Sequence, residues 1–253
     1  MVNFDLIPQQ AAAFLILFAR IGSVLMLLPV FSEDAVPGRI RLLIALGMTI
    51  GLWGMLGDQT MPAAASSDGL FGVLLVEMLV GLGLGLLVKM MFHAIAIAGS
   101  IISLQIGLSS AIVFDQSQGG QAALLSRFVS VAAAVVCMSL AVHHLWIASI
   151  VRSYTLFPVG GLPAAGDFAA IALRTATSAM SLGVSLAAPL LVYGIVFNVA
   201  LGLVARLAPA IQVFFVVQPL NLILGIGLFA FVLGAILTSF ATAMADWMQA
   251  GWS

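Results

Sequence analysis

The chain has 253 residues, of which 63% are hydrophobic and only 7% charged, and its formal net charge is −1. An ordinary soluble domain carries roughly 25% charged residues, so this composition predicts an all-α, polytopic membrane protein built from long apolar runs. The polar gaps, at most about a dozen residues each, are too short for a separate soluble domain. The sequence has no basic run, which argues against nucleic acid or an acidic partner as its ligand.

The first predicted span runs from Ala11 to Phe31 and carries Arg20 near its centre. A charge that faces lipid at this depth costs about 2.5 kcal/mol or more. We therefore expect Arg20 to face protein or a water-filled space. Structural pairing and a functional role are both open for it at this point.

A short polar turn, residues 32–41, leads into the second predicted span. Pro37 interrupts the chain within this turn, and Ser32 or Asp34 is a candidate cap for the helix that follows. The second span is expected to end at about Gly57, where a loop rich in Ala, Ser, Asp and Pro begins.

Residues 70–114 form a third apolar run, interrupted by Glu77 and Lys89. As a helix this run is roughly 65 Å long, about twice the thickness of a hydrocarbon core. We predict two spans here, or helices that leave the bilayer plane. The Gly-x-Gly-x-Gly run at residues 81–85 is expected to weaken the helix and to make one of its faces very small. No strand precedes this run, so a dinucleotide-binding loop is rejected.

Residues 105–121 are the most polar stretch in the middle of the chain, and they lie between two long apolar runs. Their glycines free the backbone, and their serine and aspartate side chains compete for backbone hydrogen bonds, so a loop is predicted. Irregular backbone at membrane depth is tolerated only where protein or a water-filled cavity covers it. This loop is therefore either a connector in water, the commoner case, or a segment inserted into a pore.

The next predicted span covers Ala122 to Val151 and ends with the neighbouring His143 and His144. Adjacent helical residues point about 100° apart, and no further ligand motif accompanies the pair, so no metal site is predicted. Cys137, the only cysteine, is expected to be a buried and unreactive thiol.

Two further apolar runs, Phe168 to Ala205 and Ala210 to Ala245, are each too long for a single perpendicular span. Pro189 divides the first run and residues 218–221 divide the second, so each run fits a bent hairpin. Between the two runs, Arg206 is expected to cap a helix end or to meet lipid headgroups.

Short motifs follow one another in a fixed order along nearly the whole chain. They are Arg20, Pro29, Ser32-Glu33, Pro37, Arg41, Glu77, residues 105–109, Phe114-Asp115, His144-Leu-Trp, Ser153-Tyr, residues 158–160, Pro189 and residues 198–209. This order and spacing resembles the FliR family, the flagellar export-gate proteins of bacterial type III secretion. The chain departs from the family pattern at Gln116, at Ala210 and at residues 217–219.

The resemblance implies a core subunit of the export gate in the bacterial inner membrane, at the flagellar basal body. Members assemble with FliP and FliQ, with FlhB on the cytoplasmic side and FlhA in the surrounding apparatus, and unfolded flagellar subunits pass through the centre. It also implies one integral membrane subunit over residues 1–253, with a FliP-like part over about residues 1–167 and FliQ-like hairpins over about residues 168–253. It implies no enzyme activity, catalytic residue, cofactor or metal.

In this family the central loop is a plug in the pore, which implies the same role for the loop at residues 105–121. Glycines would permit displacement, small serines would pack tightly, and apolar side chains would seal against ions. The implied plug residues are Ile106, Gly107, Leu108, Ser109, Ser110, Ile112, Val113, Phe114, Asp115, Gln116, Ser117, Gly119 and Gly120. Arg20, Glu77, Lys89 and Arg206 are interpreted as buried charges that form ion pairs between helices or between subunits.

Three alternatives remain open from the sequence. A virulence-type secretion homologue shares the architecture. A secondary transporter also uses broken helices and buried charges, but it predicts symmetry between the halves that this sequence does not display. An intramembrane hydrolase would pair Ser109 or Ser110 with His143 or His144, although Gly-Leu-Ser-Ser is not a nucleophile elbow.

Overall fold

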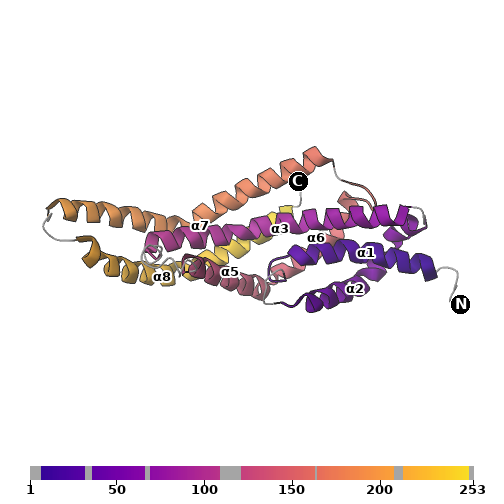
Figure 1. Cartoon of the computed structure of the whole chain (residues 1–253), viewed down its shortest axis with the longest axis horizontal. Helices are drawn as coiled ribbons and strands as arrows, with labels where there is room; N and C mark the ends of the chain where they lie inside the picture. The colour runs from indigo at the N-terminus through magenta and orange to yellow at the C-terminus, as the bar shows by residue number, and fades with distance from the viewer. Residues whose placement is uncertain are drawn as a thin grey trace. The chain divides into compact units, whose positions relative to one another are not determined.

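The computed structural model of the chain describes residues 7–31, 36–65, 69–108, 121–162, 164–207 and 213–250. Within these ranges all regular structure is helical (Figure 1). The helices are α1 (Ile7–Leu27), α2 (Gly38–Ala64), α3 (Leu70–Ile106), α5 (Gln121–Ser139), α6 (Val142–Leu156), α7 (Ala165–Leu207) and α8 (Val213–Ala250). Five of them are long and apolar enough to cross a membrane, and the broken pair of α5 and α6 counts as a sixth span if taken together. The prediction of an all-α, multi-pass membrane protein is confirmed.

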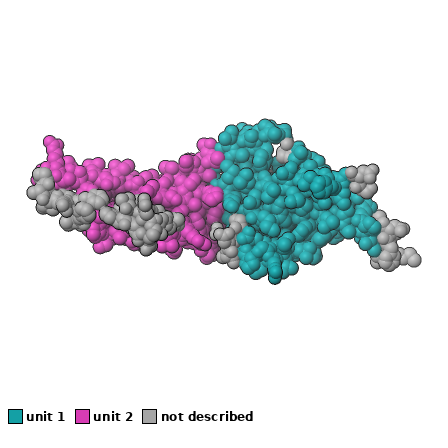
Figure 2. Space-filling model, viewed as in Figure 1, with its two compact units in different colours: residues 1–91, 143–175, 248–253 teal, residues 92–142, 176–247 magenta. Residues whose placement is uncertain are grey.

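The chain divides into two compact units, each assembled from separate stretches of sequence (Figure 2). Unit 1 comprises residues 1–91, 143–175 and 248–253, and unit 2 comprises residues 92–142 and 176–247. The unit boundaries fall inside α3, α6, α7 and α8, so each of these helices contributes residues to both units.

In unit 1, α1 packs along α2. The rings of Phe14 and Trp53 meet with their centroids 5.8 Å apart, and the Gln9 side-chain amide donates a hydrogen bond to the Met61 carbonyl oxygen over 3.1 Å. The expected end of the second helix near Gly57 is wrong. The helix continues to Ala64 because Leu56, Gly57 and Thr60 are buried by tertiary packing, which overrides the weak local propensity.

The start of α2 also differs from the expectation. Pro37 occupies the N-cap position, and its carbonyl oxygen accepts hydrogen bonds from the backbone N–H groups of Ile40 and Arg41 over 2.9 and 3.3 Å. The two candidate caps, Ser32 and Asp34, lie outside the described residues.

Residues 70–106 of the third run form one unbroken helix, α3, rather than two spans. Its 37 residues make it roughly 55 Å long, well beyond a hydrocarbon core of about 30 Å. Its glycine run is used on two faces instead of one. A Cβ atom at Gly81 would lie 2.5 Å from the Arg20 carbonyl oxygen of α1, whereas one at Gly83 would lie 2.7 Å from the ring of Phe168 at the start of α7. The glycines therefore serve close helix packing without breaking the helix.

In unit 2, small residues let α5 and α7 approach the second half of α3 closely. A Cβ atom at Gly99 would lie 2.7 Å from Cα of Ser126 in α5, and one at Gly183 of α7 would lie 2.9 Å from the Ala94 carbonyl oxygen. The Ser126 hydroxyl also donates a hydrogen bond to the Ala96 carbonyl oxygen over 2.8 Å. Phe240 of α8 completes this core, fully buried.

The predicted span from Ala122 to Val151 is instead divided into α5 and α6. The break lies at Leu140 and Ala141, and Ala141 has a φ of 58°, a left-handed conformation that ends the helix. Glycine usually occupies such a position, and because none is present here the sequence carries no signal for the break. Cys137 in α5 is fully buried and not in a disulfide, in agreement with the expectation.

The last two runs each form a single helix, and the prediction that each folds back on itself is wrong. Pro189 lies inside α7 and Pro219 inside α8. Membrane helices tolerate proline where neighbouring groups and local adjustments satisfy the freed backbone carbonyl. Asp167 in the first turn of α7 and Arg206 in its last turn both complement the helix dipole.

We predict that Gly81→Ala destabilises the protein, because the added methyl group meets backbone that cannot move aside. Overpacking of this kind costs about 1–3 kcal/mol and lowers the melting temperature by about 3–10 °C. Thermal unfolding of the detergent-purified protein measures the change. Gly72→Ala, on the same helix with open space around it, is the matched control and leaves the melting temperature unchanged. Equal behaviour of the two variants would contradict the packing role of Gly81.

Candidate functional site

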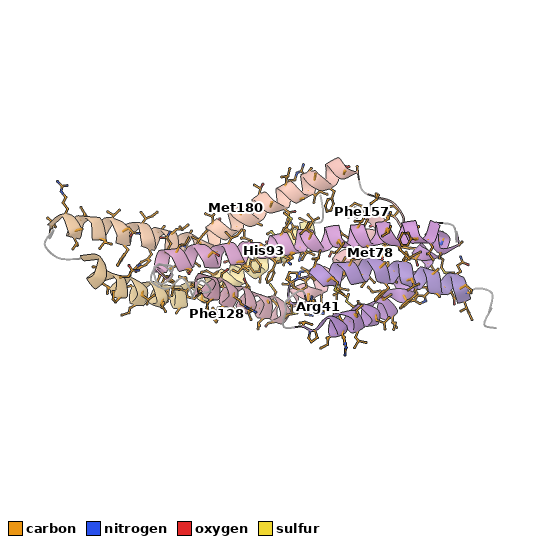
Figure 3. The ribbon with its side chains drawn as sticks, viewed as in Figure 1. Arg41, Met78, His93, Phe128, Phe157 and Met180 are labelled. Atoms are coloured by element: carbon orange, nitrogen blue, oxygen red, sulfur yellow. The ribbon has the colours of Figure 1, made fainter. Side chains whose placement is uncertain are left out.

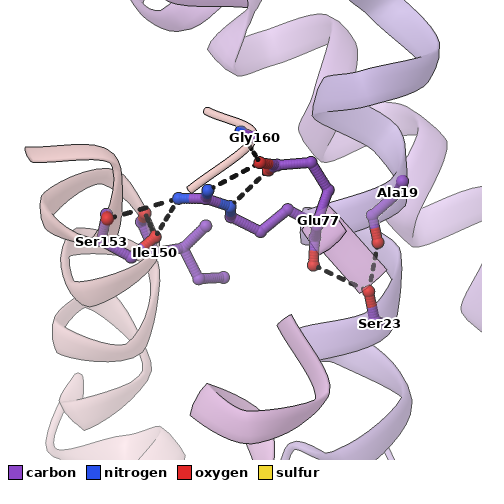
Figure 4. A network of polar contacts seen from close by, with 7 residues as sticks. Ala19, Ser23, Glu77, Ile150, Ser153 and Gly160 are labelled. Carbon is purple, nitrogen blue, oxygen red and sulfur yellow. Dashed lines mark hydrogen bonds and ion pairs between the residues drawn. The ribbon is translucent and has the colours of Figure 1, made fainter. Parts of the chain in front are cut away.

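A buried ion pair joins α1 to α3. The Arg20 Nε atom lies 2.6 Å from Oε2 of Glu77, and the Nη2 atom donates to Oε1 over 2.9 Å, which makes the contact bidentate (Figure 4). Both side chains are fully buried. This geometry matches the planar fork of a guanidinium to the two oxygens of a carboxylate.

The remaining polar groups of the pair are also satisfied. The Arg20 Nη1 atom donates to the Ser153 carbonyl oxygen and hydroxyl oxygen over 3.3 and 3.4 Å, and the guanidinium lies 4.0 Å above the ring of Tyr154. The backbone N–H of Gly160 donates to Glu77 Oε1 over 3.0 Å. The network thus ties α1, α3, α6 and the turn before α7 to one another (Figure 4).

The four charged residues singled out from the sequence separate into two groups. Arg20 and Glu77 are brought together, as described above. Lys89 is half-buried on α3 and Arg206 is exposed in the last turn of α7, and neither has an ion-pair partner within the described part of the chain.

The base of the central loop is a regular helix end. Gly107 has a φ of 87°, its N–H donates to the Leu104 carbonyl oxygen over 3.2 Å, and the N–H of Leu108 donates to the Ser103 carbonyl oxygen over 3.1 Å. This pair of hydrogen bonds is the Schellman motif, in which a left-handed glycine closes an α-helix. Ile106, the last residue of α3, is fully buried.

Most of the implied plug lies outside the described residues. The structure describes Ile106, Gly107 and Leu108 of that set. The others, which the structure does not describe, are Ser109, Ser110, Ile112, Val113, Phe114, Asp115, Gln116, Ser117, Gly119 and Gly120.

Three polar residues that sequence reasoning did not assign to the site surround this helix end. The Asn221 side-chain amide donates to the Ile106 and Gln105 carbonyl oxygens over 3.2 and 3.4 Å, and the Gln218 amide donates to the Gly107 carbonyl oxygen over 3.4 Å. The Tyr193 hydroxyl donates to Oδ1 of Asn221 over 2.9 Å.

For two of these residues, the sequence pattern could have indicated contacts between helices. Gln218 and Asn221 are three apart within an apolar helix and therefore share a face. Amide side chains at membrane depth bond across helices, because lipid offers them no partner. The sequence predicts a helix break at residues 218–221, whereas the structure places them inside α8, with the Gln218 and Asn221 amides on the end of α3.

Metal binding finds no support in the part of the chain that the structure describes. No group of three or more His, Cys, Asp or Glu side chains is found among the described residues. The rings of His143 and His144 lie with their centroids 4.3 Å apart and form a pair without a third ligand.

Comparison with known proteins identifies related chains. The family of bacterial export proteins, family 1, matches residues 11–247. Flagellar biosynthetic protein FliR of Caulobacter vibrioides is 40% identical over 221 residues, covering 87% of this chain and 88% of the relative. The FliR proteins of Escherichia coli and Bacillus subtilis are 33% and 31% identical, and the matches cover 83% and 86% of this chain and 80% and 83% of the relatives.

We predict that Arg20→Met destabilises the protein by about 3–5 kcal/mol, because it leaves the Glu77 carboxylate buried without its partner. Thermal unfolding of the purified protein and its amount in membranes measure the loss. The double variant Arg20→Met with Glu77→Leu removes both charges and recovers much of it.

Arg206→Met is the matched control for Arg20→Met, since Arg206 is exposed at a helix end. It is expected to leave the stability of the isolated chain within about 0.5 kcal/mol. An Arg20→Met protein as stable as the parent would show that the buried pair does not hold the helices together.

Proposed function

The chain belongs to the FliR family of bacterial export proteins, and we propose that it is a core subunit of the flagellar type III export gate. In this proposal it forms, with FliP and FliQ, the channel through which unfolded flagellar subunits cross the inner membrane. Its central loop, predicted over residues 105–121, is bounded in the structure by Ile106 at the end of α3 and Gln121 at the start of α5. In this proposal the loop is the plug that closes the channel at rest.

The observation that carries the proposal is the extent of the match to flagellar proteins. The similarity to the Caulobacter relative covers nearly nine-tenths of both chains, and the three relatives named above are flagellar biosynthetic proteins. This favours a flagellar apparatus over a virulence-type one. The whole length, residues 1–253, is proposed as one membrane subunit, with a FliP-like part over about residues 1–167 and a FliQ-like part over about residues 168–253.

Exposed apolar side chains support a place among other membrane helices. Met78, Phe128 and Met180, labelled in Figure 3, are 45%, 52% and 58% exposed. A helix as long as α7, with 43 residues, also exceeds the thickness of a hydrocarbon core about twofold. We propose that FliP and FliQ cover part of these surfaces and that FlhB and FlhA adjoin the assembled gate, in the inner membrane at the flagellar basal body.

Lys89 and Arg206 also support an assembly with other subunits. Lys89 and Arg206 lack ion-pair partners among the described residues, and a charge at membrane depth needs one. We propose that carboxylates of neighbouring subunits supply these partners. Arg20 and Glu77 act within the chain and would set the shape that the neighbours recognise.

The plug assignment rests on the position of the loop and on its composition. α3 closes at Gly107 and α5 begins at Gln121, so the loop connects two apolar helices. Irregular backbone at membrane depth must lie in protein or in a water-filled cavity. Ile112, Val113 and Phe114 give the loop an apolar stretch that is suited to a seal against ions.

We predict that tagged chain, purified from membranes in mild detergent, brings FliP and FliQ with it in a stable complex. Mass spectrometry of the purified material identifies the partners, and a strain with the untagged chain is the control. A clean monomer or homodimer would contradict the export-gate proposal. Virulence-type partners would assign the chain to the other branch.

We predict that replacing Ile112, Val113 and Phe114 with Gly and Ser makes the resting inner membrane leakier to small ions, because the apolar seal is lost. Potassium efflux from non-secreting cells measures the leak. The control replaces residues 66–68, in the connection between α2 and α3, with the same residue types. An unchanged leak in the loop variant would contradict the plug assignment.

A further inference from the structure

We propose that a groove in unit 1, here called the turn groove, binds one phospholipid with a zwitterionic headgroup from the surrounding membrane. The groove lies beside the turn that joins α6 to α7, where Phe157 is labelled in Figure 3. An acyl chain fills its apolar part, and the phosphate and ammonium groups of the headgroup meet Arg174 and Asp167. This inference goes beyond the export-gate proposal and does not depend on it.

The turn groove consists of two adjoining hollows that share Phe157, Leu162 and Phe168. The hollow against α3, lined by Val80 and Leu84, has a volume of about 170 Å³, and the one along the start of α7 has a volume of about 230 Å³. All of these residues belong to unit 1. Each hollow is smaller than the roughly 300–1,000 Å³ of a pocket for a drug-sized ligand, so a slim chain suits the groove.

The walls of the turn groove are held in place by contacts within unit 1. Gly83 of α3 has no side chain, and a Cβ atom there would lie 2.7 Å from the Phe168 ring, so this ring lies directly against α3. The backbone N–H of Gly160 donates to Oε1 of Glu77 over 3.0 Å, which ties the turn to the same helix. The buried ion pair therefore also supports the shape of the groove.

The lining of the turn groove calls for an apolar occupant. Leu79 and Leu162, both lining residues, are 57% and 62% exposed. An unfilled hollow leaves its lining atoms without van der Waals partners on one side. Lipid tails are as apolar as leucine, so a tail in the groove gains packing contacts but little hydrophobic free energy. Selection among lipids must therefore come from the headgroup.

Asp167 and Arg174 provide one charge of each sign beside the turn groove. Asp167 lines the groove, and Arg174 lies one turn of α7 beyond Ile171, another lining residue. Asp167 and Arg174 are two turns apart on nearly the same face of the helix, roughly 10 Å along its axis. Residues that pair directly on a helix are three or four apart. Both side chains are exposed, and neither has an ion-pair partner among the described residues.

These two charges complement a zwitterionic headgroup better than an anionic one. A guanidinium binds phosphate in bidentate fashion, and a carboxylate attracts an ammonium group. Phosphatidylethanolamine carries both a phosphate and an ammonium group. Phosphatidylglycerol carries the phosphate alone, which leaves the Asp167 carboxylate without a cation. We therefore expect the groove to prefer the ethanolamine headgroup.

Native mass spectrometry of the full chain, purified in mild detergent, tests the turn groove with two added lipids. They are phosphatidylethanolamine and phosphatidylglycerol with the same palmitoyl and oleoyl tails. We expect one molecule of phosphatidylethanolamine to bind about fivefold more tightly than phosphatidylglycerol, the factor for one charge contact at a membrane surface. Equal binding of the two lipids, or binding of neither, would overturn the proposal.

Two charge variants test the headgroup contacts. Asp167→Asn should abolish the preference for phosphatidylethanolamine, because the cation loses its carboxylate. Arg174→Gln should weaken the binding of both lipids about fivefold, because the phosphate loses its guanidinium. Arg39→Gln, the same substitution at an exposed position of α2, is the matched control and should change neither affinity. An equal loss in Arg39→Gln and Arg174→Gln would show that the contact is not specific and would overturn the site.

Ala165→Phe tests the tail contact, because Ala165 is exposed and lines the turn groove, so that the added ring fills the hollow. Lipid binding should fall to the background level. Ala170→Phe, exposed on α7 outside the lining, is the matched control and should bind as the parent does. If the Ala165→Phe protein fails to accumulate, the two charge variants, both at exposed positions, decide the outcome.

A partner protein is the competing occupant of the turn groove. If Ala165→Phe leaves lipid binding unchanged but removes a co-purifying protein, the groove receives a side chain of that protein and the lipid proposal is overturned. Co-purification of FliP and FliQ with the unaltered chain is a separate measurement. A failure of lipid binding therefore leaves the export-gate proposal standing, and a failure of co-purification leaves the lipid site standing.

Discussion

The Arg20–Glu77 pair is the interaction on which the arrangement of unit 1 depends. In a chain with 7% charged residues, one arginine and one glutamate lie fully buried and satisfy each other in bidentate fashion. The cost of removing both charges from water is offset only if every remaining donor and acceptor is bonded. Ser153 and Gly160 supply such hydrogen bonds, and the Tyr154 ring lies over the guanidinium. These contacts bring α6 and the following turn to α1 and α3.

A single helix, α3, carries both of the polar features described above. Glu77 lies near its start in unit 1, and its last carbonyl groups accept hydrogen bonds from the Asn221 amide in unit 2. The Arg20–Glu77 hydrogen bonds are charge-assisted and measure 2.6 and 2.9 Å. The Asn221 hydrogen bonds join neutral groups over 3.2 and 3.4 Å.

From the sequence, the residues with structural roles were easier to predict than the residues they contact. The cost of a charge in lipid placed Arg20 against protein, but Glu77 is 57 residues away and only tertiary packing joins them. Gly107 was expected to free the backbone, and it does close α3. No glycine or proline indicates the helix break at Ala141. Conversely, Pro189 and Pro219 predict helix breaks, but both residues lie inside continuous helices.

An electron cryo-microscopy map of the proposed gate, purified through this chain in its resting state, tests whether the central loop closes the channel. We expect residues 109–120 of this chain to lie across the channel axis, with Asn221 bonded to the end of α3. A resting channel closed by other subunits, with these residues on its outer surface, would contradict it.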